Sequence, residues 1–579
     1  MIKKLAGYAA EFKKDTILTP VYVALEVVME TIIPLLMAMI IDNGVGKGNV
    51  GYVTIIGAVM IFAAFLSLTF GVLGGKHAAK ASTGFARNLR KGMYYNIQNF
   101  SFSNIDKYST AGLITRLTTD VTNVQNAFHM MIRMFVRAPF MLISATAMCF
   151  YINAKISLIF VGAIVFLSII LYFIMTRVHP YFVEVFKKYD DLNASVQENL
   201  TAIRTVKAYV REEHETKKFY KASEVLYTFF IRAEKLIIIN APAMQFTVYT
   251  CILLLSWLGA KMIVGNSMTT GELMSLFAYT TNILMSLMFL SMIFVMVIMS
   301  RSSVERITEV LDEKSDLANG ENPIYEVKDG SITFKDVNFS YSKNLENSVL
   351  QDVDIKINSG ETIGIIGGTG SAKSTLVQLI PRLYDATKGS VEVGGIDVRK
   401  YDLETLRDEV SMVLQKNVLF SGTIKENLRW GNKEATDEEI IAACRQAQAE
   451  EFIENLPDKY DTHIEQGGTN VSGGQKQRLC IARALLKKPK ILILDDSTSA
   501  VDTKTDSLIR KAFKETIPDT TKIIIAQRIS SVEEADRIIV LNDGKIDGFG
   551  THAELLAAND IYREVYESQV KGADNNESK

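Results

Sequence analysis

The sequence predicts a helical, membrane-spanning half followed by a soluble α/β half. The chain has 579 residues, which is too long for a single domain. Its long apolar stretches lie in roughly the first 300 residues, although 48% of the whole chain is hydrophobic. After Ile324 the apolar runs are short and alternate with polar residues, as is typical of strands.

Six apolar segments are long enough to cross a bilayer, which takes about 20 residues each. They lie near Ile17–Ile41, Tyr52–Gly74, Phe135–Ile152, Ile156–Met175, Leu236–Val264 and Leu273–Met299. One such segment could be a buried core helix, but six in one half of a chain predict a membrane domain. The lipid bilayer is therefore an expected partner, whereas a formal net charge of −2 gives no basic footprint for nucleic acid.

The distribution of positive charge predicts the orientation. Two long connections, between spans two and three and between spans four and five, are helical in composition and rich in Lys and Arg. The positive-inside rule puts both connections and both termini in the cytoplasm. The tips of the connections, near Ser109–Val121 and Tyr209–Phe219, are expected to contact the second half of the chain. The amphipathic segment Met1–Asp15 suits a helix lying on the membrane surface, with a short soluble helix as the alternative.

Two features within the spans are candidates for a substrate cavity. Glu26 and Glu30 lie four residues apart and so share one helical face, where carboxyl groups could attract cationic cargo. The alternative is an internal hydrogen bond to a neighbouring helix, or a position close to the membrane interface. The last span carries methionines at helical spacing, and such adaptable side chains suit either promiscuous binding or plain helix packing. These methionines are Met285, Met288, Met292 and Met296.

A phosphate cradle is predicted at the start of the soluble half. The apolar run Thr362–Ile366 is expected to be a strand, and a helix is expected over Leu376–Leu383. Between them stand Gly367, Gly368, Thr369, Gly370, Ser371, Ala372, Lys373, Ser374 and Thr375. Backbone N–H groups of such a turn face phosphates, the Lys reaches the β- and γ-phosphates, and the Ser hydroxyl binds Mg²⁺. Ala372 stands where the pattern has Gly, which is tolerable at negative φ and costly at positive φ.

Further motifs stand before and after the cradle in a fixed order. They are Tyr341 in Phe339–Tyr341, Gln415 in Val413–Gln415, Ser472, Gly473, Gly474 and Gln475 in Val471–Gln475, Asp495 after the apolar run Ile491–Leu494, and Asp502 in Ser499–Asp502. In this order and spacing they resemble the nucleotide-binding domain of ABC transporters, and the whole chain resembles an ABC exporter half-transporter. The resemblance implies ATP and Mg²⁺ as cofactors.

The resemblance also implies a role for each motif. Tyr341 would stack on adenine, while Gln415 would sense Mg²⁺ and Asp495 would organise it. Ser472–Gln475 matches the family signature, and the loop ending at Asp502 would cross to an opposing domain. In the family two domains close head to tail around two ATP molecules, so that the signature of one chain completes the site of the other.

The chain departs from the family pattern mainly around its own cradle. Asp496 occupies the place of the Glu that acts as general base, and Gln527 replaces the switch histidine. Ala372 and Glu465–Gly467 depart as well, whereas the signature is intact. Random sequence drift in an ordinary homodimer would be expected to alter the signature residues as well. The pattern therefore favours the degenerate-site half of a heterodimer, which binds ATP but hydrolyses it poorly and completes the site of a second half-transporter.

We therefore expect an exporter of amphipathic compounds, plausibly drugs, in the bacterial plasma membrane. A homodimeric lipid flippase or peptide exporter is the alternative, and a membrane-anchored regulator or channel is a third class. The expected domains are a transmembrane domain at 1–305, a linker at 306–325, a nucleotide-binding domain at 326–570 and a disordered tail at 571–579.

Overall fold

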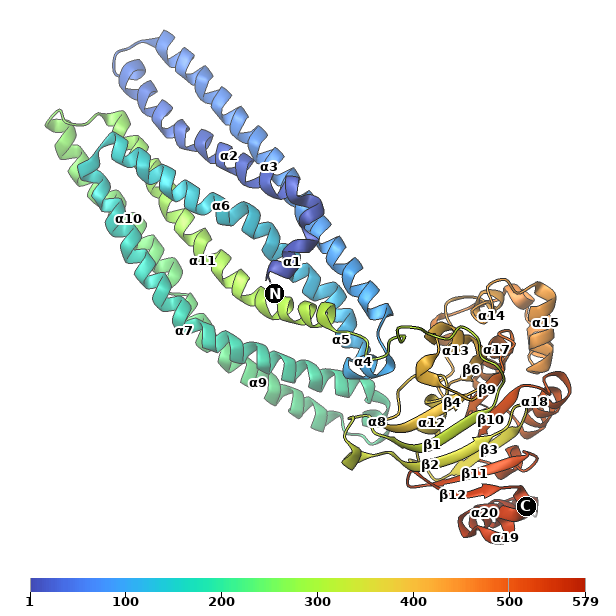
Figure 1. The fold of residues 1–579 in the computed structure, drawn as a ribbon. Helices are drawn as coiled ribbons and strands as arrows, with labels where there is room; N and C mark the ends of the chain where they lie inside the picture. The colour runs from blue at the N-terminus through green and yellow to red at the C-terminus, as the bar shows by residue number, and fades with distance from the viewer. Residues whose placement is uncertain (1, 498, 578–579) are drawn as a thin grey trace. The chain divides into compact units, whose positions relative to one another are not determined.

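The computed structural model describes residues 2–497 and 499–577, which form two compact units (Figure 1). The first unit holds the chain up to Gln98 together with Ser109–Glu313. The second holds Asn99–Tyr108 and the chain from Lys314 onward. A short segment of the helical half therefore belongs to the α/β unit.

The first unit consists of helices. They are α1 (Ile2–Tyr8), α2 (Lys13–Met39), α3 (Val50–Gln98), α5 (Thr110–Thr115), α6 (Val121–Ile152), α7 (Ala154–Thr201), α8 (Ile203–Ala208), α9 (Glu212–Ile237), α10 (Asn240–Val264) and α11 (Thr270–Asp312). Among the described residues, six helical segments are long and apolar enough to span a membrane, which confirms the predicted number. Helix α3 has 49 residues and is roughly 70 Å long, more than twice the thickness of a bilayer core. Helix α7, with 48 residues, is likewise far longer than a bilayer crossing requires, as expected of membrane helices that continue into the cytoplasm.

The predicted fifth span, which lies within the apolar helical segment Glu212–Val264, contains a break in the helix. The sequence predicts it from Leu236, but α9 ends at Ile237 and α10 starts at Asn240. Pro242 explains the position of the break, because a proline is accommodated in the first turn of a helix and not in its interior. The remainder of the predicted span, to Val264, coincides with α10.

The N-terminal segment packs against α3. Met1 lies outside the described residues, and from Ile2 the chain forms α1 and a 3₁₀ turn before α2. A Cβ atom on Gly84 would collide with the ring of Phe12, and one on Gly92 would collide with the ring of Tyr8. These two glycines of α3 therefore make room for the two aromatic rings. The apolar side chains of the predicted amphipathic segment thus pack on helix α3.

The segment that enters the second unit lies ten residues earlier than the predicted tip. It contains α4 (Phe102–Lys107), which Ser101 caps in a reciprocal capping box with Asn104. The hydroxyls of Ser101 and Ser103 donate to Asp316 at 2.5 and 2.7 Å. The predicted tip, Ser109–Val121, instead belongs to the first unit. The sequence reading missed the capping signal at Ser101, which ends the long helical connection early.

The predicted linker and tail also differ from the structure. Helix α11 continues to Asp312, past the predicted start of the linker at residue 306, and Arg306 pairs with the buried Asp120 at 2.5 Å. This ion pair anchors the end of α11 to the turn before α6. Helix α20 (Asp560–Glu577) runs through most of the tail predicted as disordered, although Gly572, Asp574, Asn575 and Asn576 have low helix propensity. Residues 578–579 lie outside the described part.

The second unit is built on two main sheets. The smaller one has the order β2-β1-β4-β5 and is antiparallel, and the larger one has the order β12-β11-β3-β10-β9-β6. A short pair, β7-β8, lies apart from them. The strands are β1 (Ile332–Phe339), β2 (Leu350–Ile357), β3 (Thr362–Gly367), β4 (Lys388–Val393), β5 (Ile396–Asp397), β6 (Val410–Val413), β7 (Gly422–Thr423), β8 (His463–Ile464), β9 (Ile491–Asp495), β10 (Thr521–Ile525), β11 (Arg537–Asn542) and β12 (Lys545–Gly550). The fold class predicted from the sequence is confirmed.

Helices surround the larger sheet. Besides α20 they are α12 (Lys373–Gln378), α13 (Leu403–Glu409), α14 (Ile424–Leu428), α15 (Asp437–Gln446), α16 (Glu450–Glu454), α17 (Gly473–Leu485), α18 (Thr503–Thr516) and α19 (His552–Ala558). Helix α12 stops at Gln378, five residues before the predicted end at Leu383. One apolar core lies between the two main sheets, and a second joins α15, α17 and α18 to the larger sheet.

Strand order positions the candidate site. Strands β3, β10 and β9 are parallel neighbours in the larger sheet. Their carboxyl ends therefore meet at one edge, where ligands bind in open α/β sheets. Gly367 ends β3, Ile525 ends β10 and Asp495 ends β9, so the segments that follow them emerge side by side.

Candidate nucleotide-binding site

The predicted cradle is a turn that joins β3 to α12. Gly370 has φ +85°, in the left-handed region that glycine adopts without strain. A Cβ atom on Gly367 would collide with the backbone oxygen of Leu541 on the neighbouring strand β11. The backbone path therefore requires glycine at both positions, which explains why the turn carries the glycine pattern seen in the sequence.

Ala372 adopts the conformation that the sequence analysis treated as costly. Its φ is 71° and its ψ is 22°, so it caps α12 in the left-handed region. A left-handed residue with a Cβ atom costs about 1–2 kcal/mol, which glycine at this place would avoid. The cradle of this chain is therefore a strained version of the pattern.

Lys373 points back into the turn. Its Nζ donates to the carbonyl oxygens of Gly367 and Gly368, both at 2.8 Å. Burial lowers the pKa of Lys373, and the nearby Asp495 and Asp496 oppose that effect. The ammonium group is thus held at the centre of the cradle, where it is available to an anionic ligand.

Ser374 and Asp495 form a pair suited to a hard cation. The Ser374 hydroxyl donates to Asp495 Oδ1 at 2.9 Å, and Asp495 is buried. Burial raises the pKa of Asp495, whereas the Ser374 hydrogen bond lowers it. A hydroxyl and a carboxylate are the oxygen ligands that Mg²⁺ takes beside phosphates, so these residues fit an ATP–Mg²⁺ complex. Gln415 is exposed after β6, and no hydrogen bond among the described residues joins it to this pair.

The predicted adenine-stacking residue lies beside the cradle helix. The Tyr341 hydroxyl is 3.0 Å from Thr375 Oγ1, and Tyr341 as a whole residue is 48% exposed. An exposed ring face next to the cradle is what a stacked base requires. Tyr341 also makes an edge-to-face contact with Tyr384, with ring centroids 5.3 Å apart.

Tyr384 is a residue that the sequence analysis missed. Its hydroxyl donates to Asp106 of α4 at 2.6 Å, and its ring lies 6.0 Å from that of Phe102. A continuous chain of contacts therefore leads from α4 through Tyr384 and Tyr341 to the cradle helix. The signal that could have found it is an aromatic residue soon after the cradle helix, Tyr384 in Arg382–Asp385.

Asp496 and Gln527 are joined to each other. Gln527 Nε2 donates to Asp496 Oδ2 at 2.8 Å. Asp496 has φ 50° and follows β9, while Gln527 follows β10, so the parallel register brings them together. Both are predicted site residues, and the hydrogen bond between them is evident only from the structure.

The signature segment lies with the Asp502 loop and makes no hydrogen bond with the cradle among the described residues. Ser472, Gly473 and Gly474 line a hollow with Ala500, Val501 and Asp502. A Cβ atom on Gly474 would stand 2.9 Å from the backbone oxygen of Ala500. Ser472 caps α17 in a reciprocal capping box with Gln475, and Asp502 caps α18 by accepting from Thr505 N at 3.0 Å. That backbone hydrogen bond lowers the pKa of Asp502.

The two carboxylates in the first span have an internal partner. Arg137 of α6 donates to Glu26 at 2.5 Å and to both oxygens of Glu30 at 2.9 and 2.7 Å. Glu26 is only 8% exposed, and its Oε2 has no hydrogen-bond partner. Of the alternatives left open by the sequence, the geometry favours interaction with a neighbouring helix. Arg137 itself was missed, although it is a charged residue within the predicted third span.

The methionines of the last span do not share one environment. Met285 and Met292 are 44% and 58% exposed, and Met288 and Met296 are half-buried. Phe289 and Phe294 beside them are also exposed. The stripe therefore presents an apolar face in the single chain.

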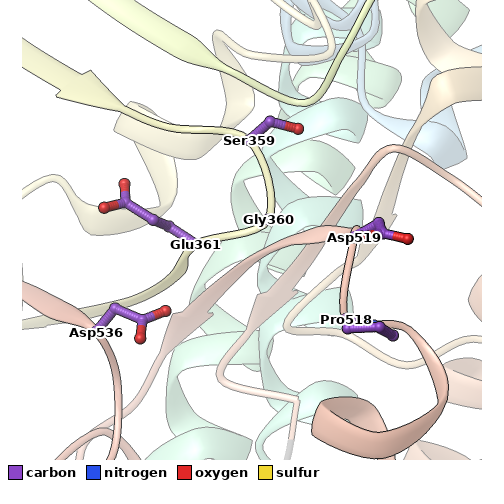
Figure 2. Close-up of a pocket in the computed structure, with 6 residues that line it drawn as sticks. All are labelled: Ser359, Gly360, Glu361, Pro518, Asp519 and Asp536. Atoms are coloured by element: carbon purple, nitrogen blue, oxygen red, sulfur yellow. The ribbon is translucent and has the colours of Figure 1, made fainter.

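A separate hollow lies at the opposite end of the larger sheet. Figure 2 shows that Glu361, Asp519 and Asp536 surround it together with Ser359, Gly360 and Pro518. Thr362 begins β3 there, and Asp536 precedes β11, so this is the amino-terminal edge of the strands. Glu361 is paired with Arg537, and Asp536 accepts from Thr362 N at 2.7 Å. These two carboxylates already serve the fold, and none of the predicted site residues lies there.

Comparisons with protein families agree with this geometry. Residues 16–288 match the model of the ABC transporter transmembrane region, and residues 350–499 match that of ABC transporters. The uncharacterized ABC transporter ATP-binding protein YfiB of Bacillus subtilis (strain 168) is 39% identical over 553 residues, which is 96% of each chain. A second protein of that organism, YfiC, also named an uncharacterized ABC transporter ATP-binding protein, is 28% identical over 98% of this chain and 94% of its own.

A solved structure supports the fold independently. The structure of a bacterial Atm1-family ABC exporter with ATP bound superposes with a TM-score of 0.82. The similarity covers 97% of this chain and 100% of the exporter chain at 23% sequence identity. The arrangement of six apolar helical segments with an α/β unit is therefore that of an exporter half.

Proposed function

Since the chain belongs to the ABC transporter family and carries its ATPase domain, we propose that it is the degenerate-site half of a heterodimeric exporter. It binds ATP at a weak site of its own and lends its signature to the site of a second half-transporter. The observation that carries the proposal is the contrast within one domain, because the signature loop is intact while the cradle side departs at three positions, Ala372, Asp496 and Gln527.

The local geometry around Asp496 supports weak hydrolysis. A general base must reach the attacking water, and Asp is one methylene shorter than Glu. Its Oδ2 is also engaged by the amide of Gln527. A displacement of about 1 Å can reduce a rate by about 10²-fold. Gln527 can donate a hydrogen bond but, unlike an imidazole, it cannot carry a proton or a positive charge at neutral pH.

The signature segment supports a role toward another chain. Its glycines and the start of α17 line a hollow with the Asp502 loop, and no cradle residue lines that hollow. A helix start with exposed backbone N–H groups is a ready site for an anion. The phosphates it faces would therefore be those bound by the cradle of a second half-transporter. Bacillus subtilis has at least two ABC transporter ATP-binding proteins that match this chain, YfiB and YfiC, so one bacterial cell can contain two different chains of this kind.

The same proposal covers orientation and cargo. Positive charge in the two long connections favours a plasma-membrane protein with its nucleotide-binding domain and both termini in the cytoplasm. The exposed methionines and phenylalanines of α11 favour amphipathic cargo with an apolar body. Glu26 and Glu30 support cationic cargo less than the sequence alone would, because Arg137 neutralises one of the two charges.

Transport in inverted membrane vesicles tests the proposed function. Vesicles that contain this chain together with a half-transporter bearing Glu and His at the positions of Asp496 and Gln527 should accumulate an amphipathic dye when ATP is added. Vesicles with this chain alone should not. Equal accumulation by the chain alone would overturn the heterodimer, and ATP-driven lipid translocation without dye uptake would favour the flippase.

Asp496→Glu should raise the ATPase rate of the isolated chain only in part. The longer carboxylate restores reach toward the water, but Gln527 still lacks an imidazole. Steady-state phosphate release from the purified chain measures the effect, with the double variant Asp496→Glu/Gln527→His as the comparison. If Asp496→Glu alone reaches the rate of the double variant, Gln527 has no part in the weakness of the site.

A further inference from the structure

The C-terminal helix α20 is attached to the segment that carries Gln527. Gln569 Nε2 donates to the backbone oxygen of Gln527 at 2.9 Å, and Gln569 Oε1 accepts from the backbone N–H of Ile529, also at 2.9 Å. One side-chain amide therefore binds both a carbonyl and an N–H group two residues apart. This two-point attachment fixes the backbone on both sides of Arg528.

The attachment satisfies a specific need of the backbone. Ile529 begins a 3₁₀ turn, Ile529–Ser531, and Arg528 before it provides no side-chain cap. The first N–H groups of a helical turn lack partners within the turn. Gln569 supplies the missing acceptor from a distant part of the chain. Gln569 therefore satisfies a backbone N–H group that has no acceptor within its own turn.

Helix α20 is itself held firmly in the domain. Tyr562 is fully buried, and its hydroxyl lies 2.7 Å from His552 Nδ1. Val565 packs against the apolar core that contains Ile529 and Val532. Gln569 follows Tyr562 by seven residues and so lies on the same face of the helix. The core thus sets where the Gln569 amide is held.

The other end of the segment is fixed as well. Ser531 Oγ donates to the buried Asp506 of α18 at 3.0 Å. Gln527 lies between these anchors and Asp496, to which its side chain donates. The path from the C-terminal helix to Asp496 therefore consists of Gln569, the backbone of Gln527 and the side chain of Gln527.

We propose that Gln569 is a positioning residue, which holds the segment Gln527–Ile529 so that Gln527 stays against Asp496. Through this contact the C-terminal helix α20 keeps Gln527 and Asp496 of the nucleotide site in a fixed position relative to each other. The inference rests on the ATPase class of the chain, and it holds whether the chain works with a different partner or with a copy of itself.

Hydrogen exchange on the full-length protein in lipid nanodiscs tests the attachment directly. Gln569→Ala should speed exchange of the Ile529 amide by about tenfold or more, because its acceptor is lost. Gln569→Glu keeps the acceptor for Ile529 but loses the donor to Gln527, so exchange at Ile529 should stay near the native rate. The matched control is Ser568→Ala, next to Gln569 on the exposed side of α20, and it should change nothing.

ATPase kinetics of the same variants test the consequence. In the Asp496→Glu background, in which this chain's own site hydrolyses ATP faster, Gln569→Ala should lower kcat several-fold with little change in KM for ATP, since the cradle residues are untouched. Gln569→Glu should also lower kcat, because the carbonyl of Gln527 loses its donor. Unchanged exchange and unchanged kcat in Gln569→Ala would overturn the proposal, as would an equal effect of Ser568→Ala. If instead the isolated chain proves to be a fast ATPase, the heterodimer fails, while the exchange result still decides the role of Gln569.

Discussion

Gly474→Ala in this chain should reduce the ATPase rate of the assembled transporter by about 10²-fold. The new Cβ atom would stand 2.9 Å from the backbone oxygen of Ala500, which cannot rotate away as a flexible side chain would. Either the signature or the Ser499–Asp502 loop must then move by a fraction of an ångström. Phosphate release by the purified pair, with this chain as the only variant subunit, measures the loss.

Two companion variants make the experiment specific. Gly320→Ala, in the linker, is a matched glycine substitution because no atom lies within 4 Å of the added Cβ, and it should leave the rate unchanged. Asp496→Asn should change the rate of the pair by less than about threefold, since the fast site uses the carboxylate of the second half-transporter. If Asp496→Asn is as damaging as Gly474→Ala, fast hydrolysis takes place at this chain's own cradle.

Arg137→Met should reduce the stability of the membrane domain by about 3–5 kcal/mol. The substitution leaves Glu26 and Glu30 without the guanidinium that both contact, in a helix packed within an apolar bundle. Unpaired carboxylates at this depth are costly, so part of the protein should fail to fold. The yield of monodisperse protein after detergent extraction and its thermal melting temperature measure the effect.

Neutralising the carboxylates should reverse that loss. The triple variant Arg137→Met, Glu26→Gln and Glu30→Gln removes the uncompensated charge. Replacing all the members of a buried ion pair or triad together often leaves the stability of a protein nearly unchanged. Arg133→Met, one turn earlier on α6, is the matched control because Arg133 makes no ion pair among the described residues. If Arg137→Met were as stable as the unmodified protein, Glu26 and Glu30 would not depend on Arg137 for their stability in the span.

The sequence was sufficient where chemistry requires particular residues at particular spacing. The glycines of the cradle, Lys373 and Ser374 are constrained by the backbone path and by charge, so a linear pattern reveals them. The six apolar spans are equally evident, because length and composition alone decide whether a helix can cross a bilayer. Asp495, Asp496 and Gln527 could be singled out through the family resemblance, whereas their meeting at one sheet edge is evident only from the parallel pairing of β9 and β10.

Contacts between distant segments could not be read from the sequence in the same way. Nothing local in Arg137 shows that it faces Glu26, because helix order and rotation in the membrane domain decide that pairing. Gln569 is an ordinary polar residue at the end of the predicted nucleotide-binding domain, and only the fold brings it to Ile529. The displacement of the first tip to α4 has a local cause, the capping box at Ser101, which was present in the sequence and was overlooked.

The ATPase rate of this chain purified alone in lipid nanodiscs, with and without Asp496→Asn, tests the central claim most directly. The account predicts turnover at least about 10²-fold slower than that of the assembled pair, and almost no further change in the variant. Fast turnover by the isolated chain that Asp496→Asn abolishes would contradict it.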